Sequence, residues 1–368
     1  MQSPVVQVDL NQLANNIRHV VSGLTSESEI MFTVKSDAYG HGIGPVSARA
    51  AQEGVSWFCV AYFEEALEVR KAAPDADILI LGPIHPHEVA DCMEQKITPT
   101  VVDAGHAQML GDEAQKHPST LHVHLKVDTG MGRMGILESQ DTAELKAILQ
   151  TPGLHISGIC SHLATVDLKK PWLQQTQHDR FVKAYTEAER ILGRRLMRHF
   201  SSSRGIQYYP EWDHDAVRPG ILLYGYGTRD SDMRFQTKPI LQMTGRLMQV
   251  KRVPKNTPVG YYSSYRTTRA TQIGVVGTGY ADGYLRSLSN RGEALIRGQR
   301  VKVVGRISMN WITVDLGPDL ECAMGDEVVL IGQQDQEEIW ADWLGHQGDT
   351  IAYEILTAIH PRIPRVYS

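Results

Sequence analysis

Residues 30–42 read IMFTVKSDAYGHG, and the fold prediction starts from this stretch. A short apolar run, 30–34, is followed at once by a lysine, a glycine-containing turn and a segment with helical spacing. A run of this kind, bounded by polar or glycine residues and followed by a helix, is typical of a βα unit.

The same unit recurs along the first two thirds of the chain. Predicted helices separate the strands, for example over 63–73 and 178–192. The predicted strands are 30–34, 56–61, 77–81, 98–102, 121–127, 155–160, 196–200 and 216–224. Eight βα units in about 225 residues indicate a closed, TIM-like (β/α)8 barrel.

The pattern changes after Pro239, where strands follow one another across turns with no helix between them. The predicted strands are 240–253, 272–277, 294–304, 311–316 and 327–331. Capping residues predict two late helices, one around 338–344 and one that ends near 359. We therefore expect a barrel domain over 10–237 and a mainly β domain over 238–368, with strand 1–9 joined to the second domain.

The composition argues against several classes of partner. The 368 residues contain 37 Lys plus Arg and 42 Asp plus Glu, so the net charge is −5. No Lys/Arg run exceeds two residues, so neither nucleic acid nor a membrane surface is expected to bind. The N-terminus has no basic and apolar leader pattern, which predicts a cytoplasmic protein. The four cysteines are far apart and no His/Cys cluster is present, so no metal site is predicted.

Lys35 is the first chemical signal because it directly follows an apolar strand. Active sites of barrels lie at the C-terminal ends of the strands. An amine that is desolvated there is a good nucleophile for a Schiff base with a carbonyl compound or with pyridoxal phosphate. Ser202, Gly220 and Ile221 follow the last two strands, where barrels commonly bind phosphate. Together these residues predict pyridoxal 5′-phosphate as the cofactor.

Residues 34–42, VKSDAYGHG, resemble the pyridoxal-phosphate signature of the alanine racemase family, whose usual form is KANAYGHG. The resemblance extends along the whole chain. It includes 65–70 (EALEVR), 126–135 (KVDTGMGRMG), 161–162, 218–220 (RPG), 259–261 (VGY), 279–284 (GYADGY), 305–306 with Met309, and 353–354 with 362–367 (RIPRVY).

This resemblance implies a homodimer with shared active sites that interconverts L- and D-alanine. Lys35 would hold the cofactor and act as one acid–base group, and Tyr261 of the partner subunit would act as the other. Two bases are needed because a proton must leave one face of the substrate Cα and return on the other. By the same resemblance, His162 and Arg218 would support the tyrosine, and Arg218 would hydrogen-bond the pyridine nitrogen of the cofactor.

The remaining site residues also come from the resemblance. The cofactor contacts would be His162, Arg218, Tyr39, Ser202, Gly220, Ile221 and Tyr353, the last five of them on the phosphate. Arg133 and Met309 would contact the substrate. Lys126 matches a lysine that is often carbamylated, and such an anion would orient Arg133. Residues at the substrate entrance would be Asp167, Tyr280, Arg286 and Arg306.

Some positions depart from the family pattern and leave alternatives open. Ser36, Asp37 and Ser201 differ from the usual residues, and Tyr262 and Asn310 lie near the side of the pocket that the partner supplies. Because one or two methylenes change specificity by only about 1–3 kcal/mol, a broader alanine and serine racemase is one alternative. Two further alternatives are a decarboxylase of the same fold and a non-catalytic pyridoxal-phosphate carrier. If the match at Lys35 is accidental, the alternative is a sugar-processing barrel enzyme. The physiological role could be supply of D-alanine for peptidoglycan or breakdown of L-alanine.

Overall fold

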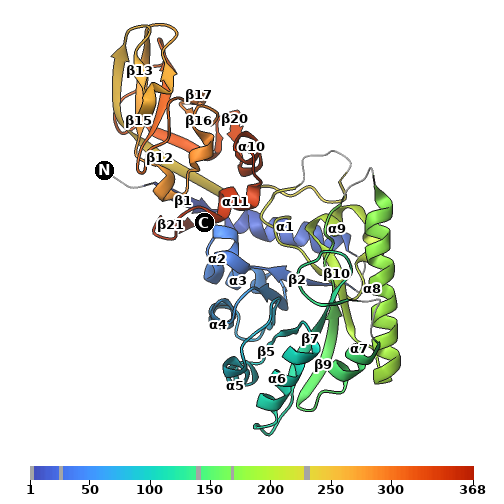
Figure 1. The fold of residues 1–368 in the computed structure, drawn as a ribbon. Coiled ribbons are helices and arrows are strands. Elements are labelled where there is room, and N and C mark those ends of the chain that lie inside the picture. The colour runs from blue at the N-terminus through green and yellow to red at the C-terminus, as the bar shows by residue number, and fades with distance from the viewer. Residues whose placement is uncertain (1–3, 25–27, 138–141, 167–169, 228–232) are drawn as a thin grey trace. The chain divides into compact units, whose positions relative to one another are not determined.

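The computed structural model describes residues 4–24, 28–137, 142–166, 170–227 and 233–368. The chain divides into two compact units (Figure 1). The barrel unit consists of residues 14–38 and 43–237, and the β unit consists of residues 1–13, 39–42 and 238–368. The short segment 39–42, which belongs to the predicted cofactor signature, therefore packs with the β unit.

The barrel unit is built on parallel strands. They are β2 (Glu29–Thr33), β3 (Trp57–Val60), β4 (Asp77–Ile80), β5 (Ile97–Thr98), β6 (Thr100–Val101), β7 (Leu121–Asp128), β8 (Ile136–Leu137), β9 (Leu154–Cys160), β10 (Met197–Ser202) and β11 (Ala216–Arg218). The pairing runs β5-β4-β3-β2-β11-β10-β9-β7-β6, and β8 is an addition to β7.

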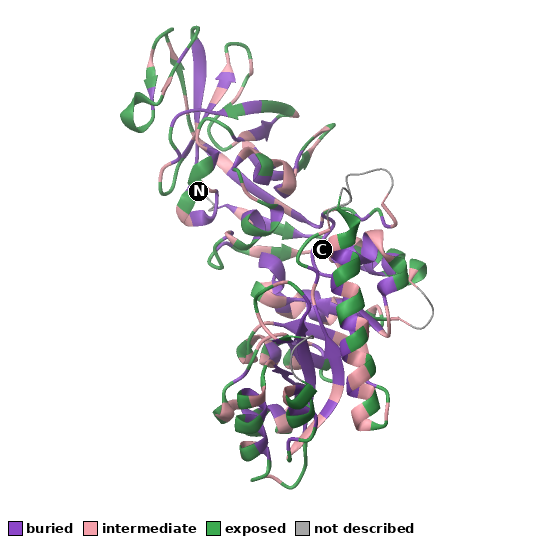
Figure 2. Ribbon diagram, turned by 45° about the vertical axis from the view of Figure 1, so that its right-hand side comes forward, coloured by how far each residue is buried: buried purple, intermediate pink, exposed green. Residues whose placement is uncertain are grey.

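Pro99 separates β5 from β6 because proline has no N–H for the ladder. With these two short strands counted as one interrupted strand, eight strand positions close into a ring, which confirms the predicted (β/α)8 barrel. The strands are almost wholly buried, whereas the helices outside them bury one face and expose the other (Figure 2). Met31, Cys59, Leu79 and Ala216 form a buried cluster in the barrel interior. Phe32 and Phe58 lie on the opposite face of the same strands, toward the helices, and the ring of Phe32 is 5.3 Å from that of Tyr224.

Helices follow the strands around the barrel. They are α1 (Leu10–Gly23), α2 (Lys35–Gly40), α3 (Ile43–Gln52), α4 (Phe63–Ala72), η1 (Pro86–Glu88), α5 (Val89–Glu94), α6 (Ala104–Ala114), α7 (Thr142–Leu149), α8 (Pro171–Leu192), α9 (Ser203–Tyr208) and η2 (Pro210–Trp212). The first residues of α1 and the last two of α2 belong to the β unit. None of the helices in the described ranges is long and apolar enough to span a membrane.

The β unit contains one large, mainly antiparallel sheet of order β20-β19-β16-β17-β18-β15-β12-β1-β21 and a small hairpin, β13-β14. Its strands are β1 (Val5–Val8), β12 (Leu241–Val253), β13 (Pro258–Val259), β14 (Tyr265–Arg266), β15 (Thr271–Val276), β16 (Glu293–Ile296), β17 (Gln299–Val303), β18 (Ile312–Gly317), β19 (Glu327–Gln334), β20 (Glu337–Ile339) and β21 (Arg365–Tyr367). Its helices are η3 (Tyr261–Ser263), η4 (Tyr280–Asp282), η5 (Arg286–Leu288), α10 (Ala341–Gln347) and α11 (Ala352–Thr357). The N-terminal strand β1 pairs antiparallel with β12 and parallel with β21.

Several predicted element boundaries were wrong. The helix expected from residue 338 begins at Ala341, because the residues before it pair with β19 as strand β20. The run expected as a strand over 294–304 is the hairpin β16–β17, and it turns at Arg297 and Gly298, with φ of 51° and 70°, where the sequence carries a turn signal. The eighth barrel strand ends at Arg218 instead of 224, and α8 begins seven residues earlier than predicted, at Pro171.

Candidate active site

Lys35 lies two residues after the C-terminal end of β2, at the start of α2. The next four residues, Ser36 to Tyr39, have φ between 52° and 55°, so α2 is a turn of left-handed helix. This conformation costs roughly 1–2 kcal/mol per non-glycine residue, so surrounding contacts must hold it. Gly40, which ends the turn with φ of 80°, fits against the backbone of Leu356, where a Cβ would lie 2.4 Å from the carbonyl oxygen.

Glu65 on α4 is one of the contacts that hold this turn. One carboxylate oxygen accepts a hydrogen bond from the N–H of Ser36 at 2.6 Å, and the other accepts from the N–H of Ala61 at 2.8 Å. Burial lowers the pKa of Lys35, and the positive charge of Arg133 adds to this effect. The amine is therefore shifted toward its neutral, nucleophilic form.

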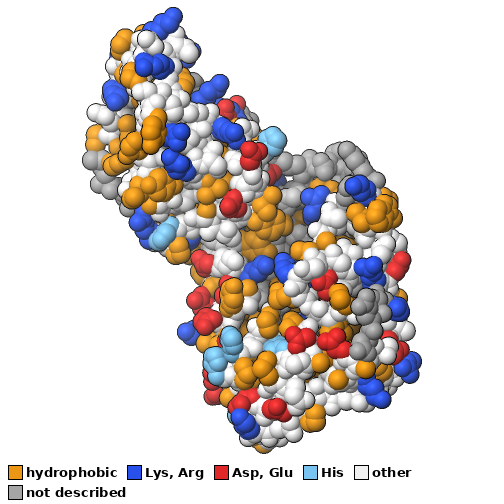
Figure 3. All heavy atoms as spheres, in the orientation of Figure 1, with side chains coloured by type: hydrophobic (Ala, Val, Ile, Leu, Met, Phe, Trp, Pro, Cys, Tyr) orange, Lys and Arg blue, Asp and Glu red, His pale blue; other side chains and the backbone are white. Residues whose placement is uncertain are grey.

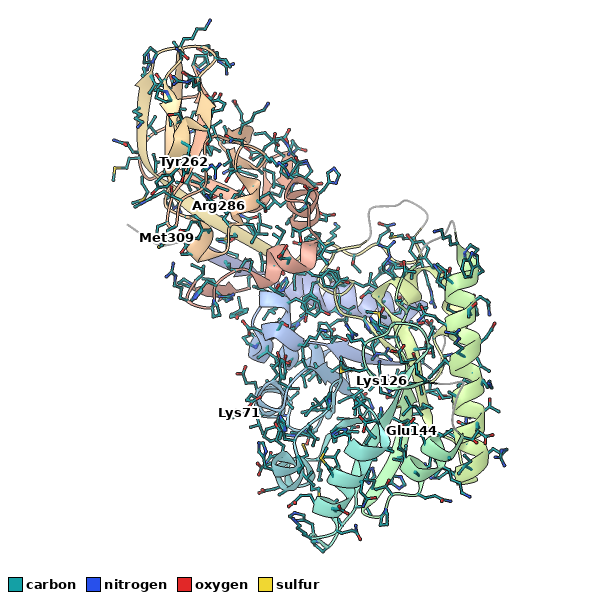
Figure 4. The ribbon with its side chains drawn as sticks, viewed as in Figure 1. Lys71, Lys126, Glu144, Tyr262, Arg286 and Met309 are labelled. Atoms are coloured by element: carbon teal, nitrogen blue, oxygen red, sulfur yellow. The ribbon has the colours of Figure 1, made fainter. Side chains whose placement is uncertain are left out.

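Lys126 points from β7 into the barrel, where Figure 4 labels it. Burial lowers its pKa to about 8, and the charges of Arg218 and Arg133 act in the same direction. Gly135 makes room for this side chain, because a Cβ at that position would lie 2.9 Å from Cγ of Lys126.

The loop after β7 is organised by Asp128. Its carboxylate accepts hydrogen bonds from four consecutive backbone N–H groups, 130–133, at 2.8 to 3.1 Å. Burial acts to raise the pKa of Asp128, but these hydrogen bonds outweigh it and leave the pKa lowered. The loop presents Arg133 with an exposed guanidinium that makes no hydrogen bond within the described residues.

Arg218 ends β11 and is 4% exposed. Its Nη1 donates to Nδ1 of His199 at 2.6 Å and to the His199 carbonyl at 2.7 Å. Its Nη2 donates to the carbonyls of Ser161 at 2.5 Å and Phe200 at 3.0 Å. The four Nη–H groups are thus used by the chain, while no described residue accepts from Nε–H.

His162 follows β9 in the same cluster of basic groups. Burial holds its pKa well below the ordinary value, and Lys126, Arg218, Arg133 and Lys35 lower it further by their positive charge. The ring is therefore neutral near pH 7 and can accept a proton. It makes no hydrogen bond to Arg218; the imidazole that contacts Arg218 is that of His199.

The segments after β10 and β11 meet through a serine that the sequence analysis did not select. Oγ of Ser203 accepts hydrogen bonds from the N–H groups of Gly220 at 3.0 Å and Leu222 at 3.2 Å. The N–H of Gly220 is therefore already used. The N–H of Ile221 and the hydroxyl of Ser202 have no partner within the described residues.

In the β unit, Tyr39 and Tyr353 lie side by side, with ring centroids 5.6 Å apart. The guanidinium of Arg365 also donates to the carbonyl of Gly40 at 3.1 and 3.2 Å, so β21 helps to fix this segment. Two predicted phosphate ligands that are more than 300 residues apart in sequence are thus brought together by the fold.

Tyr261 lies in η3 with its side chain 64% exposed, and the preceding Gly260 has φ of 74°. A Cβ on Gly260 would lie 2.8 Å from the backbone nitrogen of Arg306, so only glycine permits this close approach of the two loops. The Arg306 guanidinium lies over the ring of Tyr262, 4.9 Å from its centroid.

The loops around Tyr280 and Met309 are joined by backbone hydrogen bonds, from Tyr280 N–H to the Ser308 carbonyl and from Ala281 N–H to the Met309 carbonyl. Tyr280 and Met309 are 42% and 55% exposed. Arg286 begins η5 and is exposed; Figure 4 labels it together with Tyr262 and Met309. Asp167, the remaining predicted site residue, lies outside the described residues.

Four residues with clear structural roles near this site were absent from the predicted set: Glu65, Asp128, His199 and Ser203. Two of them carried a usable signal, because Glu65 and Asp128 stand inside segments that carry the family resemblance. His199 and Ser203 carried no such signal. Their side-chain partners, Arg218 and Gly220, lie on and just after the next strand, β11, and only the folded barrel brings them together.

Comparison with known proteins gives matches along the whole chain. The family model described as alanine racemase, N-terminal domain, matches residues 8–228, and the model described as alanine racemase, C-terminal domain, matches 240–367. A curated alanine racemase from Desulforamulus reducens is 36% identical over 373 residues, which cover 100% of both chains.

Solved structures agree with this result. Alanine racemase from the D-cycloserine-producing Streptomyces lavendulae superposes with a TM-score of 0.93 at 31% identity, over 100% of this chain and 97% of that chain. Alanine racemase from Bartonella henselae, solved with covalently bound pyridoxal phosphate, gives a TM-score of 0.85 at 27% identity over 100% of both chains.

Proposed function

The chain belongs to the alanine racemase family and interconverts L- and D-alanine, and we propose that it does so with pyridoxal 5′-phosphate and two bases, Lys35 and Tyr261 of the partner subunit. The observation that carries this proposal is the position of Lys35. It is a partly buried lysine with a lowered pKa, at the C-terminal end of a barrel strand and beside a left-handed turn that strains the backbone. Such a turn is retained where it positions a functional group.

The donors of the barrel unit fit this cofactor. The Nε–H of Arg218 is the one N–H of this buried guanidinium that the chain leaves unused, and we assign it to the pyridine nitrogen. Because a guanidinium does not give up its proton, the ring nitrogen would accept this hydrogen bond and stay unprotonated. The bound cofactor would withdraw electrons from the substrate Cα and so acidify its proton.

For the phosphate we propose the hydroxyl of Ser202, the N–H of Ile221 and the phenols of Tyr39 and Tyr353. Backbone N–H groups and hydroxyls at the end of barrel strands commonly bind phosphate in this way. Gly220 would lie beside the phosphate without donating to it, because its N–H already donates to Oγ of Ser203.

Arg133 would bind the substrate carboxylate, because its guanidinium is exposed and a planar guanidinium suits a bidentate contact with a carboxylate. Lys126 would turn into an anionic partner for Arg133 if carbamylated. Its lowered pKa supports this, because only the neutral amine can react with CO2.

Exposed apolar side chains on the β unit support a homodimer. Tyr261, Tyr262, Met309 and Trp311 are 64%, 86%, 55% and 47% exposed. Large exposed apolar groups that gather on one surface are typical of an interaction site. A second subunit would bring Tyr261 to the face of Cα opposite Lys35, with neutral His162 and Arg218 close by, and with Met309 beside the substrate.

The substrate entrance would be formed by Tyr280, Arg286 and Arg306, together with Asp167. Tyr262 and Asn310 stand where the family pattern differs, so turnover of serine in addition to alanine is the second candidate function.

A cytoplasmic location and the supply of D-alanine for peptidoglycan remain predictions. On the face drawn in Figure 3, cationic and anionic side chains are interspersed over the barrel unit, which agrees with a small-molecule substrate.

The deciding experiment is an NMR time course of L-alanine in D2O with the purified protein, with chiral analysis in parallel. Loss of the Cα proton signal together with D-alanine formation is expected. L-Serine and L-lysine, run in the same way, measure the breadth of the pocket. Release of CO2 would instead identify a decarboxylase, and no exchange with any amino acid would identify a carrier protein.

A further inference from the structure

A cavity of about 530 Å³ opens at the end of the barrel opposite to Lys35. Its lining includes the first residues of five strands, Trp57, Asp77, Ile97, Leu121 and Met197, which places it at the N-terminal ends of the parallel strands. This volume lies in the range that small-molecule sites occupy, roughly 300–1,000 Å³. None of the residues assigned to the racemase site lines it.

The lining combines apolar side chains with hydroxyl and imidazole groups, so it suits a ring that carries a polar group but no net charge. Trp57, Met93 and Met197 are half-buried and form apolar walls, and aromatic and thioether groups pack well against a ring. At the mouth, Asp77 and Lys96 are exposed and opposite in charge, so neither an anion nor a cation is favoured overall.

His124 provides the polar group deep in the cavity, with 1% of its surface exposed. Its ring lies against Gly158, where a Cβ would approach Nε2 to 2.6 Å, so glycine makes room for the imidazole. Nδ1 of His124 is 2.8 Å from Nε2 of His199. Nε2 of His124 has no partner in the part of the chain that the structure describes.

The hydrogen-bond chain from Arg218 fixes which nitrogen of His124 carries the proton. A guanidinium can only donate, so Nδ1 of His199 accepts from Arg218 and its Nε2 is protonated. Nε2–H of His199 then donates to Nδ1 of His124. Neutral His124 therefore carries its own proton on Nε2. Burial supports the neutral form, because it lowers the pKa of His124 to about 3.

We propose that this cavity is a second small-molecule site, which binds an uncharged aromatic carbonyl compound through the Nε2–H of His124 and is coupled to Arg218 through His199. The Nε2–H of His124 is a hydrogen-bond donor on the lining of the cavity, so a carbonyl oxygen on the ligand can accept from it. A ligand that donates a hydrogen bond to Nε2 of His124 is rejected. It would move the proton of His124 to Nδ1, so that His199 would have to donate to Arg218, and a guanidinium cannot accept a hydrogen bond. The coupling rests on the proposed role of Arg218 at the cofactor, whereas the binding site does not.

The binding test uses the holoenzyme and two small probes of the same skeleton. Benzamide offers a carbonyl acceptor, and benzylamine offers only a cationic donor. Saturation-transfer NMR should show benzamide binding and no benzylamine binding, and in protein with ¹⁵N-labelled histidine benzamide should shift the Nε2 resonance of His124. Equal binding of both probes would overturn the hydrogen-bond direction on which the site depends.

Ser157→Trp fills the cavity from its wall and leaves His124, His199 and the racemase residues unchanged. Alanine racemisation should stay at the wild-type rate in this variant, while benzamide saturation transfer is lost. Gln175→Trp, an exposed change on α8 outside the cavity, is the matched control and should keep benzamide binding. Undiminished binding in Ser157→Trp would overturn the assignment to this cavity.

The coupling test titrates the cofactor-free protein with pyridoxal phosphate, with and without saturating benzamide. We expect the cofactor Kd to change at least about fivefold, the lower end of typical coupling between sites, with no change in Ser157→Trp. An unchanged Kd in the wild type overturns the coupling. Absence of cofactor binding under both conditions would instead contradict the proposed function and leave the benzamide result standing.

Discussion

The carboxylate of Glu65 lies 2.6 Å from the backbone nitrogen of Ser36, the residue that follows Lys35. Through its second oxygen, the same carboxylate binds the N–H of Ala61 after β3. One side chain thus joins the segments that leave two neighbouring barrel strands. Because the turn after Lys35 is left-handed at four consecutive non-glycine residues, this anchor determines where the lysine amine can lie.

Glu65→Ala should lower kcat about tenfold through loss of this positioning, and should lower the free energy of unfolding by about 1.5–3 kcal/mol, the usual contribution of a hydrogen bond to a charged group. Steady-state kinetics and urea unfolding measure the two effects. Glu64→Ala, an exposed neighbour on the same helix, is the control and should change neither. A wild-type kcat in Glu65→Ala would show that the turn holds its position without the carboxylate.

Arg218→Lys should weaken both the barrel and the cofactor site. An ammonium cannot reach the carbonyls of Ser161, His199 and Phe200 together, and each buried acceptor left without a partner costs about 1–3 kcal/mol. We expect a lower Tm and a pyridoxal-phosphate Kd at least tenfold higher. Arg204→Lys, an exposed change on α9, should leave both values unchanged. Cofactor binding at wild-type strength in Arg218→Lys would remove Arg218 from the pyridine contact.

The sequence predicted the architecture well because eight apolar runs end at chemically informative residues, and the strand periodicity changes sharply after Pro239. It failed where long-range pairing decides the local structure, as at residues 337–339, which become a strand only because β19 offers a free edge.

The site shows the same limit. Lys35 and Arg218 could be found from position and motif, but the neighbour of Arg218 could not. His199 lies on β10, the strand that pairs with the Arg218 strand β11, and no spacing in the sequence predicts that contact.

Lys126 should make stability depend on pH in the alkaline range. Burial lowers the pKa of this amine to about 8 in the folded protein from an ordinary value of 10.5, so between these values the unfolded chain binds more protons. Stability contributed by this group therefore rises with pH over that interval.

Urea unfolding in CO2-free buffer should show Lys126→Met to be more stable than the wild type at pH 7, by up to a few kcal/mol, since one pKa unit corresponds to about 1.4 kcal/mol. The advantage should shrink as the pH rises from 8 to 10.5. Lys116→Met, at an exposed salt bridge, is the control and should show no such trend. A difference that stays constant with pH would mean that folding does not change the pKa of Lys126.

Mixing two inactive variants tests whether Tyr261 acts across a dimer. Lys35→Ala lacks one base and Tyr261→Phe lacks the other, so each homodimer should be inactive in alanine racemisation. In a heterodimer, one of the two sites combines the intact Lys35 of one subunit with the intact Tyr261 of the other.

Random exchange makes half of the dimers heterodimers, so about a quarter of the wild-type activity should return after the subunits are mixed under mild denaturation and refolded. The two variants, each refolded alone, are the controls and should stay inactive. If both bases came from one chain, no heterodimer would contain an intact site, and the mixture would stay as inactive as its components. Recovery near a quarter therefore supports a site shared between subunits, because an intramolecular pair cannot produce it.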